Sequence, residues 1–304
     1  MIEARNLTKD YGDKRAVDDL SFDVKPGIVT GFLGPNGSGK STTMRLILGL
    51  DRPSKGHVTV NGKSYAQHAA PLREVGALLE ARSVHTGRSA RNHLLALAQT
   101  HGIGRARVDE LIDMVGLHDV AKKRAGKFSL GMGQRLGIAS ALLADPQTVM
   151  LDEPVNGLDP EGIQWIRNLL RGLAQEGRTV FVSSHLMSEM ALTADHLIVI
   201  GRGKLIADTP VADFVARASK DIVNVRSPQR AELRRAVEAL GATATDEGED
   251  GLEVVGLSTA QVGEAAAEHR IVLHELTPHQ ASLEEAFMDL TRGELEFGHE
   301  EVVA

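Results

Sequence analysis

Short apolar runs alternate with helix-like segments through the first 210 residues of this chain. Seven runs are candidate strands: residues 2–7, 17–24, 28–33, 148–151, 179–182, 196–200 and 204–207. The runs at 148–151 and 179–182 carry almost no polar residues, which is typical of strands buried on both faces of a parallel sheet. Their alternation with helical patterns predicts an α/β core.

Between residues 89 and 143 the apolar residues recur at helical spacing. Ser89 suits a helix N-cap, and the helix that follows it should end at Gly102. A second helix is predicted at 105–115, with Val108, Leu111 and Ile112 on one face. We expect these helices to form an insertion in the α/β core.

A second unit is predicted after residue 218. Its pattern indicates, in order, a strand, a helix, two strands, a helix, a strand and a last helix, at residues 221–226, 229–240, 242–246, 252–256, 259–268, 271–277 and 282–291. The order βαββαβ favours a small ferredoxin-like α+β module.

Composition excludes several classes of protein. The chain has 304 residues, of which 42% are hydrophobic and 25% charged, as in an ordinary soluble protein. The net charge of −7 argues against a general nucleic-acid binder, and the absence of cysteine excludes disulfides and thiolate metal sites. No apolar run approaches the roughly 20 residues of a membrane span. We therefore expect a cytosolic chain whose membrane link, if it has one, comes through a partner.

A glycine-rich loop is the most specific motif. Its residues are Gly34-Pro35-Asn36-Gly37-Ser38-Gly39-Lys40-Ser41-Thr42, which fit the phosphate-binding pattern G-x-x-x-x-G-K-[ST]. A strand pattern precedes the loop and a helix pattern follows it, so backbone N–H groups and the helix dipole face an anion. Lys40 should reach the β- and γ-phosphates, and the Ser41 hydroxyl suits a Mg²⁺ ligand. The loop predicts a site for a nucleoside triphosphate with Mg²⁺, rather than a plain glycine turn.

Two other strands end in polar groups of the right chemistry. Asp152, at the end of the strand over 148–151, suits a Mg²⁺ ligand, directly or through water. Glu153 follows it and suits the base that polarises the attacking water. His185 follows the strand over 179–182, at the edge where parallel sheets place their ligands. Its imidazole can hydrogen-bond the γ-phosphate or the water.

Taken in chain order, these motifs resemble the ATP-binding-cassette (ABC) ATPases, the nucleotide-binding subunits of transporters. Tyr11 matches the aromatic residue that stacks on adenine, and residues 34–42 match the Walker A loop. Asp152 and Glu153 match Walker B and its catalytic glutamate, and His185 matches the switch histidine. The resemblance covers residues 1 to about 218 and implies ATP with Mg²⁺ as the bound species.

Two further segments match elements that act on the partner subunit in that family. Phe128-Ser129-Leu130-Gly131-Met132 occupies the place of the LSGGQ signature, and Asp159 that of the D-loop aspartate. In the family, ATP lies between Walker A of one subunit and the signature of the other. The resemblance therefore implies that Ser129 and backbone N–H groups bind the γ-phosphate in trans, at the start of a helix predicted over 132–143. It also implies a homodimer that ATP closes and hydrolysis releases.

The resemblance further implies an architecture and a place in the cell. An ABC domain over 1–218 would combine a parallel sheet with an antiparallel β subdomain and a helical subdomain at about 85–145. An accessory domain would span 219–304. The subunit would sit on the inner face of the cell membrane, docked on integral membrane subunits through a groove near residues 80–92, without binding nucleic acid or inserting in the bilayer.

Two departures from the family pattern point to a subgroup. The signature reads F-S-L-G-M, so Met132 stands where most members have glutamine, and Glu80 stands at the Q-loop position. A carboxylate at Glu80 can still reach the metal. Both features resemble the exporters of bacitracin, lantibiotics and related peptides or drugs.

Two other classes of protein fit these residues less well than a transporter subunit does. A soluble ABC ATPase acting on ribosomes or DNA would typically carry two cassettes or a long coiled-coil insertion, whereas this chain has one phosphate loop. A GTPase or kinase would leave the signature and His185 unexplained, and the guanine-recognition motif N-K-x-D is absent.

Overall fold

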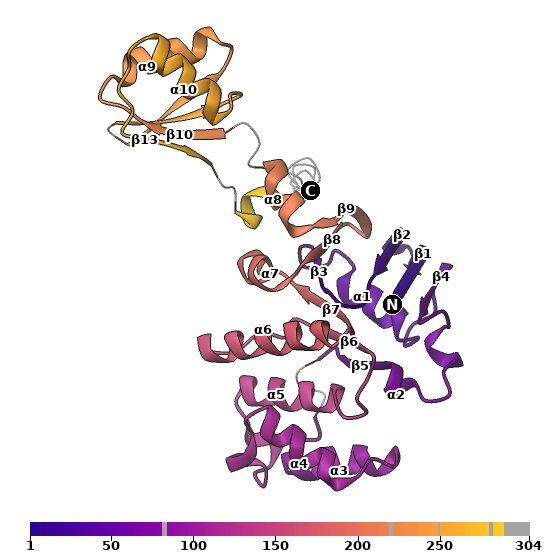
Figure 1. The fold of residues 1–304 in the computed structure, drawn as a ribbon. Coiled ribbons are helices and arrows are strands. Elements are labelled where there is room, and N and C mark those ends of the chain that lie inside the picture. The colour runs from indigo at the N-terminus through magenta and orange to yellow at the C-terminus, as the bar shows by residue number, and fades with distance from the viewer. Residues whose placement is uncertain (81–83, 219–221, 249, 280–281, 289–304) are drawn as a thin grey trace, which may run out of the picture. The chain divides into compact units, whose positions relative to one another are not determined.

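A computed structural model describes residues 1–304 apart from 81–83, 219–221, 249, 280–281 and 289–304. The chain divides into two compact units, Met1–Val211 and a second unit that begins at Ala212 (Figure 1).

A six-stranded sheet forms the centre of the first unit. Its strand order is β5 (Val75–Leu78), β6 (Thr148–Asp152), β7 (Thr179–Ser184), β3 (Val29–Leu33), β8 (His196–Gly201) and β9 (Lys204–Pro210). Neighbouring strands from β5 to β8 are parallel, and β9 returns antiparallel along β8. Residues 148–151 of β6 and every residue of β7 are buried, as their apolar runs predicted, and β3 is buried throughout as well.

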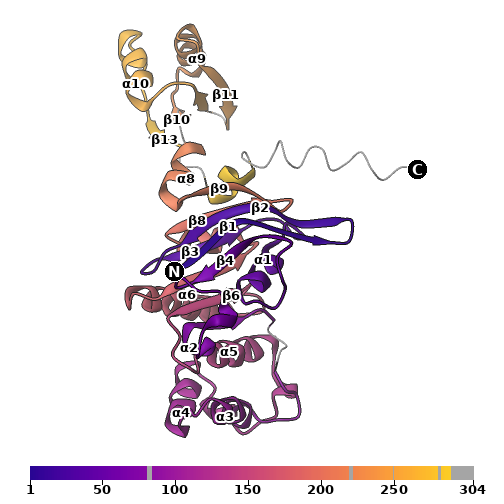
Figure 2. The same ribbon diagram turned by 90° about the vertical axis from the view of Figure 1, so that its right-hand side faces the viewer.

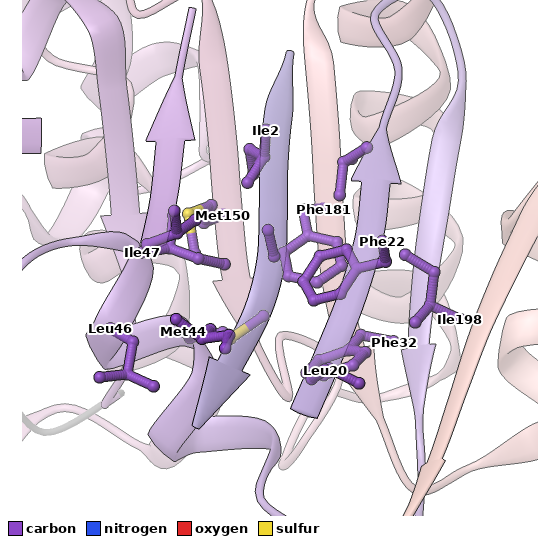
Figure 3. Packing of buried hydrophobic residues seen from close by; sticks show 14 of the residues in the cluster. Ile2, Leu20, Phe22, Phe32, Met44, Leu46, Ile47, Met150, Phe181 and Ile198 are labelled. Carbon is purple, nitrogen blue, oxygen red and sulfur yellow. The ribbon is translucent and has the colours of Figure 1, made fainter. Parts of the chain in front are cut away.

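A second, antiparallel sheet packs against the first. Its order is β2 (Lys14–Val24), β1 (Ile2–Tyr11) and β4 (Lys55–Val60). The β1–β2 hairpin extends well beyond the predicted segments, and this extension carries Tyr11 to its tip. The rings of Phe22, Phe32 and Phe181 meet between the sheets at centroid distances of 5.0–5.9 Å (Figure 3).

Helices flank the central sheet. They are α1 (Lys40–Ile47), α2 (Pro71–Glu74), α5 (Leu130–Ala141), α6 (Pro160–Gln175) and α7 (Met187–Thr193). The predicted insertion is present as α3 (Ala90–Thr100) and α4 (Arg105–Met114), which lie beside α5 (Figures 1 and 2). Ser89 caps α3 as predicted, since its hydroxyl accepts a hydrogen bond from the Asn92 N–H.

The start of α5 corrects one prediction. The sequence placed this helix at 132–143, whereas it begins at Leu130 and ends at Ala141. The Ser129 hydroxyl accepts a hydrogen bond from the Met132 N–H, so Ser129 is the N-cap and the helix starts one residue later.

The second unit has its own core and its own sheet. After α8 (Val211–Ala218) come β10 (Ile222–Arg226), α9 (Arg230–Ala239), β11 (Thr243–Glu247), β12 (Gly251–Val255), α10 (Thr259–Glu268) and β13 (Glu275–Pro278). The four strands lie antiparallel in the order β11-β12-β10-β13. The element order is the one that a ferredoxin-like module requires.

Two predictions in this unit differ from the structure. The strand predicted at 271–277 starts only at Glu275, because the N–H groups of Ile271 and Val272 bond to the Ala266 carbonyl and the Gln229 side chain rather than to the sheet. The last helix is present over residues 283–288 and begins one residue later than predicted, and residues 289–291 of its predicted range lie outside the described residues.

Candidate functional site

The β3–α1 loop forms a compact anion-binding turn. Gly37 and Gly39 have φ angles of 81° and 107°, a region that L side chains rarely adopt. A Cβ on Gly39 would also lie 2.5 Å from the Ala16 carbonyl oxygen, so only glycine fits there. The backbone N–H groups of the loop can therefore come close to an anion bound at the start of α1.

Lys40 begins α1 and points back into this loop. Its ammonium donates to the carbonyl oxygens of Gly34 and Pro35, at 2.6 Å and 3.3 Å. Burial lowers the pKa of Lys40, while the carboxylates of Glu153 and Asp152 oppose that shift. A cation held mainly by neutral carbonyls in a buried loop is well placed to receive a phosphate.

The predicted metal ligands Ser41 and Asp152 meet although they are far apart in sequence. The Ser41 hydroxyl donates to Asp152 Oδ2 at 2.8 Å, and Ser183 of the neighbouring strand donates to Oδ1 of the same carboxylate. A hydroxyl and one carboxylate form a small oxygen-only set. Mg²⁺ favours such a set when phosphate oxygens and water fill its other positions, so these residues fit the ion.

Glu153 and His185 form a pair at the same edge of the sheet. Glu153 Oε2 lies 2.8 Å from His185 Nδ1. The Glu153 N–H donates to Ser183 Oγ at 3.1 Å, and its φ of 49° is unusual for a residue other than glycine. The side chains of Glu153 and His185 are 21% and 42% exposed, so both can reach a bound ligand.

One cleft of 380 Å³ contains Lys40, Ser41, Asp152 and Glu153, whereas His185 lies behind Glu153 and is not part of the cleft lining. Its lining consists of Tyr11, Lys14, Ala16, Asn36, Gly37, Gly39, Lys40, Ser41, Thr42, Asp152 and Glu153. Tyr11 is 44% exposed, its hydroxyl donates to Asp51 Oδ2 at 2.9 Å, and Lys9 Nζ lies 4.8 Å from its ring centroid. The cleft thus joins a phosphate loop, two carboxylates and an exposed aromatic ring.

The remaining predicted site residues lie elsewhere on the same unit. Ser129, Leu130 and Gly133 line a separate hollow of 300 Å³. Asp159 caps α6 by accepting from the Gly162 N–H at 2.9 Å. Glu80 is exposed beyond the end of β5 and does not line the nucleotide cleft.

Leu130 joins the signature segment to the D-loop within one subunit. A Cβ on Gly157 would overlap the Leu130 side chain, and a Cβ on Gly131 would lie 3.0 Å from the Gly157 carbonyl oxygen. Leu130 is nevertheless 47% exposed. The two segments therefore form one continuous surface.

Comparison with known proteins decides the family. A family profile described as "ABC transporter" matches residues 17–156. The bacitracin transport ATP-binding protein BcrA of Bacillus licheniformis is 38% identical over 299 residues, which cover 96% of this chain and 98% of that protein. This chain belongs to the ABC transporter ATP-binding proteins. Like them, it binds and hydrolyses ATP.

Other relatives of this ABC ATPase match a smaller part of it. The lantibiotic transport protein SrtF of Streptococcus pyogenes is 35% identical and covers 68% of the chain and 90% of its own length. A solved dimeric cassette in a post-hydrolysis state with ADP and Pi has a TM-score of 0.64 at 25% identity, and covers 69% of this chain and 99% of its own. A profile described as a domain of unknown function (DUF8746) matches residues 221–284. Within the part of the ABC ATPase that the structure describes, none of the helices is long and apolar enough to cross a membrane.

The structure adds cleft residues of the ABC ATPase that sequence reasoning missed. Lys14 and Ala16 enter the cleft from β2, and Asp51 anchors Tyr11 from the segment after α1. The spacing of three residues between Tyr11 and Lys14, across a tight turn, is a local signal that could have identified Lys14. Asp51 had no such signal, because its partner lies 40 residues away.

Proposed function

We propose that this ABC ATPase is the energy-coupling subunit of an exporter of peptide antibiotics or related drugs. The observation that carries this proposal is the extent of the match to the bacitracin transport protein, which runs through both units over 299 residues. The lantibiotic relative covers 68% of the chain. The shared second unit therefore favours a bacitracin-type cargo over other substrates of the family.

In the proposed reaction, the loop amides and Lys40 bind the β- and γ-phosphates of ATP, and Tyr11 stacks on the adenine. Ser41 and Asp152 would hold Mg²⁺, with Glu80 as a further candidate ligand. When bound there, Mg²⁺ would supply positive charge that stabilises the negative charge developing on the phosphates. Glu153 accepts a proton from the attacking water, and His185 stays bonded to its carboxylate and holds it in place.

The second half of the site would come from a second copy of the chain. Ser129, at the N-terminus of the twelve-residue helix α5, uses a lone pair of its hydroxyl as a cap, so the hydroxyl proton is free to reach the γ-phosphate of the partner. The first N–H groups of α5, including that of Gly131, point the same way. The exposed Leu130 and the partly buried Met132 flank this helix end, and Gly157 and Leu158, just before Asp159, lie against it.

The membrane partner would dock on an apolar hollow of 420 Å³. It is lined by Tyr65, Ala69, Ala70, Pro71, Leu72, Arg73, His101, Ile103 and Ala144, between α2 and the ends of α3 and α5. Leu72, Ile103 and Ala144 also line an adjoining hollow of 200 Å³. None of the described residues of the predicted segment 80–92 lines these hollows, and the docking site proposed here is therefore the two hollows. Docking there would hold the ABC ATPase on the cytoplasmic face of the cell membrane.

The decisive experiment is purification of the Glu153→Gln variant from native membranes in MgATP, beside the wild type and the exposed control Glu264→Gln. We expect a polytopic membrane protein in near-equal amount with all three chains. After the membrane protein is removed, Glu153→Gln should be the one chain of the three that stays dimeric with ATP bound. The reason is that water activation fails in this variant while ATP binding survives. Recovery of ribosomal proteins would instead support a soluble ABC ATPase. Unchanged ATP turnover in Glu153→Gln would show that another group is the base.

A further inference from the structure

Gln134 is a buried polar residue that the nucleotide cleft does not include. It lies in the second turn of α5 and is 1% exposed. Its Nε2 donates to the carbonyl oxygen of Glu153 at 3.0 Å, and its Oε1 has no hydrogen-bond partner among the described residues. A carbonyl oxygen can only accept, so the amide must present its NH₂ group there and leave its own oxygen unsatisfied. Burying an unpaired oxygen costs stability, which suggests that this contact serves more than packing.

The backbone of Glu153 is held on both sides. Its N–H donates to the carbonyl and hydroxyl oxygens of Ser183, at 3.3 Å and 3.1 Å. Its carbonyl accepts from Gln134 and from the Asn156 N–H, the latter at 3.2 Å. These bonds maintain a φ of 49°, which a glutamate rarely adopts. Without them the residue would relax, and its carboxylate would move.

Helix α5 is itself fixed tightly to the sheet. Gln134, Gly137 and Ala141 lie on one face at helical spacing. A Cβ on Gly137 would lie 2.6 Å from Leu78 Cδ1, and a Cβ on Gly76 of β5 would overlap the Ala141 carbonyl. The helix therefore approaches β5 as closely as its backbone allows. A shift of α5 would be transmitted to Glu153 through Gln134.

We propose that Gln134 is a positioning residue that sets the backbone of Glu153 and ties it to the helix whose N-terminus faces the partner's ATP. This inference rests on the proposed roles of Glu153 and Ser129. Since Glu153 acts on the ATP of its own subunit, the Gln134–Glu153 hydrogen bond connects the two ATP sites of the dimer. Loss of that bond should lower kcat and the Hill coefficient for ATP while leaving KM nearly unchanged.

Two substitutions of similar shape test the hydrogen bond in the full-length chain. Gln134→Met removes the donor, and we expect kcat to fall about 10- to 100-fold, as expected when a reacting group is displaced by roughly 1 Å. Gln134→Glu places a carboxylate against the carbonyl, so it should be equally impaired at pH 8. Burial raises the pKa of such a carboxyl, and its protonated form can donate. The kcat of Gln134→Glu relative to wild type should therefore recover as the pH falls toward about 6, whereas that of Gln134→Met should not.

Controls separate this role from simple stability. Taking the ratio to wild type removes the pH dependence that all variants share through the charged groups of the site, which are Glu153, Asp152, Lys40 and His185. Gln164→Met, on the exposed face of α6, should retain wild-type turnover. The proposal is overturned if Gln134→Met keeps its kcat, or if both variants lose kcat and ATP affinity together without recovery at low pH. Full turnover in Glu153→Gln would instead remove the assignment of the base, whatever the Gln134 variants do.

Discussion

At the scale of single residues, the cleft holds a charge that the empty protein stabilises poorly. Lys40 donates to two neutral carbonyls, and burial lowers its pKa. A lowered pKa means that the unfolded chain binds the proton more tightly than the folded chain does. The charge of Lys40 therefore lowers the free energy of unfolding below its folded pKa, and this cost disappears as the pH rises toward the unfolded pKa of about 10.4. At neutral pH its charge opposes folding until a phosphate arrives.

We therefore predict that Lys40→Met separates stability from binding. Without nucleotide, the variant should melt at the wild-type temperature or above it, because the buried charge is gone. With MgATP at about 100 times the wild-type Kd, the wild type gains about 2.7 kcal/mol and the variant gains nothing. Thermal unfolding with and without MgATP measures both effects. The exposed Lys25→Met should keep the full gain, and a gain retained by Lys40→Met would contradict the assignment of the loop.

Tyr11 depends on a residue with no motif of its own. Its hydroxyl donates to Asp51, which also receives the Arg45 guanidinium at 2.7 Å, so the ring is held from the end of α1. We predict that Tyr11→Phe and Asp51→Ala each weaken ATP binding by roughly 0.5–1.5 kcal/mol, the usual worth of one hydrogen bond. Titration calorimetry of both variants and of the double variant provides the measurement. The losses should not add, since both remove the same bond, and full additivity would show that Asp51 does not act through Tyr11.

At the scale of elements, the contact between α5 and β5 requires the absence of side chains. A Cβ at Gly76 would overlap the Ala141 carbonyl, and that backbone oxygen cannot rotate away. We predict that Gly76→Ala destabilises the first unit by about 1–3 kcal/mol, the usual cost of overpacking. Chemical denaturation is the measurement. Gly172→Ala in α6 is the matched control: it meets open space and should stabilise by about 0.5–1 kcal/mol. Equal stability of the two variants would mean that α5 shifts at no cost.

The elements that sequence predicts well are those with local signals. Ser89 marks the start of its helix because its hydroxyl can cap the helix. The strand β7 can be predicted from the apolar run over residues 180–182. Where a segment's hydrogen bonds go to distant groups, local pattern misleads. Ile271 and Val272 look like strand residues, yet their N–H groups bond to Ala266 and Gln229.

The candidate site follows the same division. The phosphate loop, Asp152 and His185 belong to motifs of neighbouring residues that follow predicted strands. The sequence therefore indicates that they lie at the carboxyl ends of the parallel strands. Gln134 contacts Glu153 across 19 residues of sequence and Asp51 contacts Tyr11 across 40, and nothing in the intervening sequence encodes those contacts. The alignment of β6 with β7, which pairs Asp152 with Ser183, likewise appears only in the folded sheet.

At the scale of the whole molecule, each of the two compact units has its own core among the described residues, which predicts two separate unfolding events. One core lies between the sheets of the first unit, and another fills the second unit around Val225, Leu233 and Leu252. The nucleotide cleft belongs entirely to the first. A ligand stabilises only the unit that binds it, so MgATP should raise the melting temperature of one transition and leave the other in place.

We predict that calorimetry of the full-length chain resolves these transitions and that core variants identify them. Leu252→Ala should destabilise the second unit by about 2–5 kcal/mol and lower only the transition that ignores MgATP. Leu94→Ala, buried in the helical insertion, should lower only the transition that MgATP raises. A single transition that responds to MgATP and to both substitutions would show that the two units unfold together. The stability of the second unit would then depend on whether the nucleotide cleft is occupied.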